Sequence, residues 1–141
     1  MMMVTVNDIM AMGPYAGYPR ARIEALWAGR EALTAREVRD LDIPAKDRIW
    51  VLLRLLSPRG MVRAALDFAV RVEPIFAAAQ PGDTHVADCN ALTARWLAGE
   101  PVSREELRAW AAAAWAAWAA DAAEVREWQL DKVVDLIEAG E

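Results

Sequence analysis

His85 and Cys89 come nearest to a chemical site in this sequence. They lie four positions apart, so they would share one face of a helix, and Asp88 lies beside Cys89. Such a pair could form a nucleophile with its base, or supply two ligands to a metal ion. A zinc site needs roughly three or four ligands, and the chain has one histidine and one cysteine in all. We therefore predict no metal site here.

Other features also favour a protein that is not an enzyme. Cys89 lies among apolar residues at helical spacing, which suits a buried and inert thiol. Carboxylates pair at three places, Asp40/Asp42, Glu105/Glu106 and Asp131/Asp135. These pairs are explained by helix capping and by a solvated helix face, and no glycine-rich phosphate loop follows a strand. We expect no catalytic residues and no cofactor, with a small enzyme using Cys89 and His85 as the alternative.

The charge of the chain points away from nucleic acid. Its 141 residues carry a net charge of −5, with no run of basic residues that could neutralise phosphates. An acidic chain of this kind is better suited to a basic surface on a protein partner. Arginines next to Trp50 and Trp96 indicate cation–π contacts within the fold, Arg48 and Arg54 beside the first and Arg95 beside the second.

Nothing in the sequence indicates export or a membrane. A single cysteine excludes an internal disulfide, and no apolar run approaches the roughly 18–20 residues of a membrane span. Residues 1–12 contain Asp8 and lack the basic start of a signal peptide. We expect a cytoplasmic protein.

Helix signals dominate the chain, and no segment shows the alternation of a strand over more than a few residues. Thr34 with Glu37 and Ser103 with Glu106 have the spacing of capping boxes, and Gln80-Pro81-Gly82-Asp83 is a turn. Pro74 is expected to end or kink its helix. The expected helices cover residues 6–12, 19–29, 34–41, 44–56, 58–74, 84–99 and 104–139.

The last of these helices is unusual in composition. Residues 109–123 consist almost entirely of alanine and tryptophan, and Trp110, Trp115 and Trp118 fall on roughly one helical face. We predict that this stripe is core, the alternative being a groove that faces a partner. A helix of this length exceeds a compact domain, so a bend is expected near residues 120–123.

Two surfaces are the candidates for partner binding. One is the Gly/Pro loop of residues 13–19, which holds Tyr15 and Tyr18; tyrosine is a favoured contact residue when it is exposed, although loop tyrosines often dock on the core. The other is the polar face of the last helix, with Glu124, Arg126, Glu127 and Asp131.

From about residue 47 onward the order of motifs resembles an immunity-protein-like family of small Ala/Trp-rich helical proteins of bacteria and phages. The matching stretches are residues 66–72 (LDFAVRV), 94–100 (ARWLAGE) and 105–107 (EEL), the Ala/Trp run, and Gln129. Family members often carry cysteines where this chain has Phe68 and Val70. The resemblance implies a phage- or defence-associated protein that neutralises or redirects a protein target, and it brings no site residues.

The sequence thus predicts an all-α fold, a compact orthogonal array of about seven helices with a long C-terminal Ala/Trp-rich helix. We expect one domain over residues 1–141, with residues 1–43 packed on, or docking from, a core of residues 44–141. The expected function is non-enzymatic protein binding, either phage takeover of a host machine such as RNA polymerase or immunity against a toxin. A structural homo-oligomer built on the long helix is a further alternative.

Overall fold

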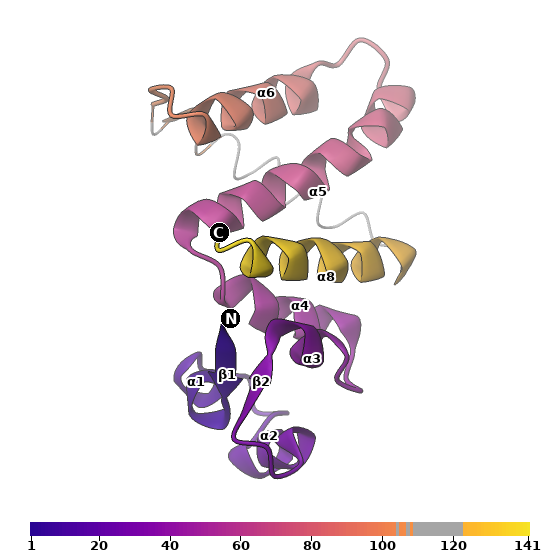
Figure 1. Cartoon of the computed structure of the whole chain (residues 1–141). Coiled ribbons are helices and arrows are strands. Elements are labelled where there is room, and N and C mark those ends of the chain that lie inside the picture. The colour runs from indigo at the N-terminus through magenta and orange to yellow at the C-terminus, as the bar shows by residue number, and fades with distance from the viewer. Residues whose placement is uncertain (104, 107, 109–122) are drawn as a thin grey trace. The chain divides into compact units, whose positions relative to one another are not determined.

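The computed structural model describes residues 1–103, 105–106, 108 and 123–141 (Figure 1). Helices make up most of this part of the chain, which confirms the all-α class. The orthogonal arrangement of the helices stays a prediction. No helix among the described residues is long and apolar enough to cross a membrane.

The chain divides into two compact units. The first comprises Met1–Ser57 together with Ala123–Glu141, and the second comprises Pro58–Ala122. The N-terminal residues up to 43 therefore belong to the same unit as the C-terminal helix.

The first unit contains a small two-stranded sheet, and each strand is followed directly by a helix. The elements of this unit are β1 (Met3–Thr5), α1 (Val6–Ala11), α2 (Arg20–Trp27), β2 (Ala32–Thr34), α3 (Ala35–Arg39), α4 (Ala45–Arg54) and α8 (Ala123–Glu138). The strands pair antiparallel, with Val4 opposite Leu33. The sequence shows no strand alternation over more than a few residues, and neither of these strands was expected from it. Strands of three residues are too short to show an alternating pattern, and only their pairing identifies them.

Each strand ends at a threonine that begins the next helix. The Thr5 hydroxyl accepts from the backbone of Asp8 at 3.1 Å, and the Asp8 carboxylate accepts from the Thr5 backbone at 2.8 Å. Thr34 and Glu37 make the same two bonds at 3.2 and 2.8 Å, as predicted. These hydrogen bonds from threonine lower the pKa of both carboxyls, Asp8 and Glu37.

The core of the first unit lies where α8 packs against α3 and α4. The residues Leu130, Val133, Val134 and Ile137 are buried along one face of α8, at the spacing of an amphipathic helix. Leu33, Val38 and Leu52 are buried on β2, α3 and α4.

The second unit contains α5 (Pro58–Ala79) and α6 (His85–Leu97), which pack against each other. The sequence predicted that Pro74 would end or kink its helix, and the structure shows that Pro74 lies inside α5 and does not end it. Proline removes only one backbone donor, and it is the turn after Ala79 that reverses the chain, where the Asp83 N–H donates to Gln80 O at 3.1 Å.

Several expectations about the C-terminal third fall outside the described residues. These are the Trp110, Trp115 and Trp118 stripe, the bend near residues 120–123 and the continuity of a helix from residue 104. The capping box that precedes them is present: Ser103 N–H donates to Glu106 Oε2 at 2.8 Å, and Glu106 N–H donates to Ser103 Oγ at 3.2 Å.

Candidate binding pocket

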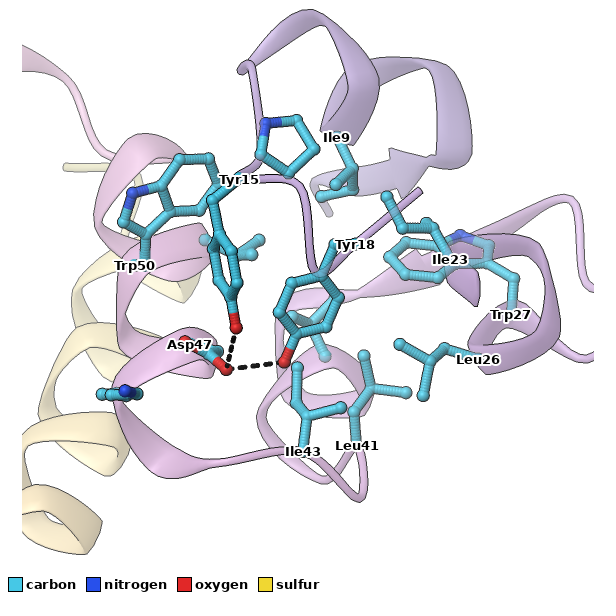
Figure 2. A pocket seen from close by; sticks show the side chains of 14 residues that line it. Ile9, Tyr15, Tyr18, Ile23, Leu26, Trp27, Leu41, Ile43, Asp47 and Trp50 are labelled. Carbon is cyan, nitrogen blue, oxygen red and sulfur yellow. Dashed lines mark hydrogen bonds between the residues drawn. The ribbon is translucent and has the colours of Figure 1, made fainter. Parts of the chain in front are cut away.

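The first unit contains a pocket of about 300 Å³ (Figure 2). The loop of residues 13–19, together with α1 and α2, supplies one wall, and α3, α4 and the connection between them supply the other. Most of the lining side chains are aliphatic or aromatic. Ligand sites are commonly apolar cavities that carry a few placed polar groups, and a volume of roughly 300 Å³ is at the small end of their range.

Asp47 is the polar centre of this pocket. The Tyr18 hydroxyl donates to Asp47 Oδ2 at 2.6 Å, and the Tyr15 hydroxyl approaches the same oxygen at 3.5 Å. Figure 2 shows both hydroxyls pointing at this carboxylate. Asp47 lies in the first turn of α4, where the helix dipole favours a negative charge. Burial, reinforced by the hydrogen bond to Asp47, raises the pKa of Tyr18.

The two tyrosines have different exposures. Their ring centroids lie 5.1 Å apart with the ring planes at 88°, a favourable edge-to-face contact. Tyr15 is 60% exposed and stands at the mouth, whereas Tyr18 is 8% exposed and forms part of the wall. Gly17 leaves room for the Tyr15 ring, because a Cβ at position 17 would lie 2.5 Å from Tyr15 Cε2.

Two arginines cover aromatic rings of the pocket. The guanidinium carbon of Arg22 lies 4.1 Å from the centroid of the Tyr18 ring, and that of Arg54 lies 3.7 Å from the centroid of Trp50. The contact between Arg54 and Trp50 confirms the cation–π expectation. Arg48 serves another purpose, because it donates to the carbonyls of Ile43 and Arg39.

Trp96 also has a cation over its ring, but not the expected one. The guanidinium carbon of Arg59 lies 5.7 Å from the Trp96 centroid. Arg95 instead pairs with Glu100, with Nε and Oε2 2.6 Å apart.

The structure brings together one of the two predicted binding surfaces. Tyr15 and Tyr18 meet at the pocket. On α8, Asp131 Oδ1 lies 2.6 Å from Arg39 Nε, and Glu127 pairs with Arg39 at 3.4 Å and Arg48 at 3.1 Å. These carboxylates therefore hold α8 to α3 and α4. Arg126 also interacts within the chain, and Glu124 occupies the first turn of α8.

His85 and Cys89 lie side by side on the same helix, α6. Cys89 Sγ and His85 Nε2 are 4.0 Å apart, and the thiol is 8% exposed. Burial, followed by the charge of Asp88, raises the pKa of the Cys89 thiol and so disfavours the reactive thiolate. Within the described ranges, no group of three or more His, Cys, Asp or Glu side chains could hold a metal ion.

Sequence reasoning missed Asp47 and the role of Trp50 as a pocket wall. Asp47 lies 29 residues from Tyr18 in the chain, and no local pattern marks this pairing. Its one available signal was the place of an acidic residue in the first turn after Pro44, which predicts a cap but not a site.

No family model, curated protein or solved structure matches this chain.

Proposed function

We propose that this chain is a non-enzymatic protein-binding module whose contact surface is the mouth of the Tyr15–Trp50 pocket. The observation that carries the proposal is a half-open apolar cavity of about 300 Å³ with a 60% exposed tyrosine at its edge. Binding energy at protein interfaces concentrates on aromatic residues beside well-packed pockets. A side chain from the partner would fill the cavity while Tyr15 contacts the surface around it.

The resemblance to immunity-protein-like sequences of bacteria and phages suggests where to find this partner. It supports either a toxin that the chain neutralises or a host machine, such as RNA polymerase, that a phage protein redirects. The net charge of −5 favours a partner with a basic surface.

A matched set of exposed substitutions tests the proposal. The full chain, Tyr15→Ala and Asp135→Ala are each used to isolate proteins from a bacterial lysate at moderate salt, and stoichiometric partners are identified by mass spectrometry. Asp135 serves as the control because it lies on α8 and its side chain is 68% exposed. We expect a complex that is lost with Tyr15→Ala and kept with Asp135→Ala.

The opposite pattern would place the interface on α8, around Asp135. If the partner binds Tyr15→Ala as tightly as it binds the unchanged protein, the pocket mouth is ruled out as the contact surface. Charge reversal at Glu127 or Asp131 is less direct, because both residues also stabilise the fold through Arg39.

Two other hypotheses have separate tests. If the chain were an enzyme that uses Cys89, Cys89→Ala would abolish its function and leave its thermal stability unchanged. If it were a structural homo-oligomer, light scattering would show an assembly larger than a monomer at high protein concentration.

A further inference from the structure

The polar groups of the pocket have an uneven distribution. Among the described lining residues, Asp47 contributes a carboxylate and the exposed residue Lys46 contributes a positive charge. A carboxylate offers about four acceptor positions on its two oxygens, and both tyrosine hydroxyls use the same oxygen, Oδ2. Asp47 therefore retains the capacity to accept hydrogen bonds from a ligand.

Two aromatic rings of the pocket already have a cation over one face. Arg22 stacks on Tyr18 and Arg54 stacks on Trp50, at 4.1 and 3.7 Å from the ring centroids. The face of an aromatic ring carries negative electrostatic potential, and guanidinium groups are the cations most often found there. Rings of tyrosine and tryptophan grouped with a carboxylate are thus suited to a positive charge that must leave water.

We propose that the group entering this pocket is an arginine side chain of a basic partner protein, with its guanidinium held by Asp47 and the aromatic rings of Tyr15 and Trp50. This inference deepens the proposed function and rests on it. Arginine combines an apolar stem with a planar, weakly hydrated cation. These two parts match a cavity that is largely apolar and carries one carboxylate, that of Asp47. It also agrees with the net charge of −5.

Lys46 provides an internal check on this assignment. Lys46 is one of the residues that line the pocket, and its positive charge opposes an incoming cation. Replacing Lys46 with glutamate removes that repulsion, and because the side chain is exposed the fold is expected to tolerate the change. An arginine ligand should bind this variant more tightly, whereas a purely apolar ligand should bind both proteins equally.

The test compares two peptides that differ in charge and hardly in shape. Ac-Gly-Ser-Xaa-Ser-Gly-amide is prepared with arginine or with its neutral isostere citrulline as Xaa. Each peptide is titrated to about 20 mM, a range that captures weak binding, while the indole N–H resonance of Trp50 is followed by NMR. That resonance is assigned with Trp50→Phe. We expect the arginine peptide to bind at least about fivefold more tightly than the citrulline peptide.

Two variants connect this preference to the pocket. Asp47→Asn keeps an oxygen that can accept from Tyr18, so it should fold, and it should reduce the preference to less than about twofold. Lys46→Glu should increase the preference. The inference is overturned if citrulline binds as well as arginine, if neither peptide shifts Trp50, or if Asp47→Asn retains the full preference with an unchanged melting temperature.

This outcome is separate from that of the proposed function. A protein partner that depends on Tyr15, together with no preference for arginine, would retain the binding module and reject the arginine. A clear preference for arginine in a chain whose complexes ignore Tyr15 would retain the cation pocket and reject the pocket mouth as the protein interface.

Discussion

The Tyr18 hydroxyl and the Asp47 carboxylate, 29 residues apart in the chain, are joined by a hydrogen bond of 2.6 Å. This bond links the loop of residues 13–19 to the first turn of α4, and so closes one side of the pocket. It also places a negative charge beside an apolar cavity. The stability of the first unit and the character of its pocket therefore depend on the same contact.

The first prediction concerns the strength of this bond. Tyr18→Phe removes the hydroxyl and leaves a partly buried carboxylate without its closest donor, so the free energy of unfolding should fall by about 1–3 kcal/mol. Tyr15→Phe is the control, because its hydroxyl is 3.5 Å from Asp47 on an exposed ring, and it should change stability by less than about 0.5 kcal/mol. Urea unfolding measures both, and equal losses would show that the bond is not the stronger contact.

The second prediction is a loss of stability in alkali. The pKa of Tyr18 is raised above its usual value of about 10, so the folded state holds the phenolic proton more tightly than the unfolded state. The contribution of this group is complete below pH 10 and falls as the pH rises beyond it. In Tyr15→Phe, Tyr18 is the sole remaining tyrosine of the chain's two, and its phenolate absorbance should develop well above pH 10. A normal titration midpoint would contradict the prediction.

The third prediction concerns the attachment of α8. Arg39 has a side chain only 22% exposed and pairs with Asp131 at 2.6 Å and Glu127 at 3.4 Å. Arg39→Met should destabilise the first unit by about 1 kcal/mol, and less at high salt. Arg20→Met is the control, because the Arg20–Glu24 pair is exposed and 3.7 Å apart. Equal denaturation midpoints for the two variants would mean that the Arg39 network adds nothing.

The fourth prediction separates the pocket from the fold. Gly17→Ala places a Cβ against the Tyr15 ring, and because that ring is largely exposed it can move aside at little cost. Stability should change by less than about 0.5 kcal/mol, while affinity for the partner or for the arginine peptide should fall. If the variant binds with unchanged affinity, the position of the Tyr15 ring does not matter for binding.

The fifth prediction tests the inertness of Cys89. Its pKa is raised, chiefly by burial, so the thiolate fraction near pH 8 is smaller than for a free cysteine. Iodoacetamide should therefore modify the folded protein at least about tenfold more slowly than the protein in urea. If the folded and unfolded chains react at the same rate, Cys89 is accessible and the enzyme hypothesis gains weight.

Local features could be predicted because their partners lie within a few residues. The capping boxes at Thr34 and Ser103 and the turn after Gln80 depend on spacings of three residues, and all three are present. The strand pairing of Val4 with Leu33 could not be predicted, because it joins segments far apart in the chain. For the same reason Tyr15 and Tyr18 could be named as candidates, but their shared carboxylate could not.

The acidic face of α8 shows most clearly what could not be predicted from the sequence. In the sequence, Glu127 and Asp131 are charges on a helix face that could equally meet solvent or a partner. In the structure they pair with Arg39 and Arg48 of the same chain. Charge type was available from the sequence, but the position of the opposite charge depends on how the helices pack.

From the amino-acid sequence alone it could be predicted that this chain is helical and where most of its helices begin. These properties follow from helix propensities and helix caps, which depend on residues a few positions apart. Only the tertiary structure decided that Asp47 joins Tyr18, that a cavity opens beside them, and that the α8 carboxylates are used internally. Such contacts depend on packing between segments that are distant in the chain. They could not be predicted because no local interaction specifies which distant side chain a residue will contact.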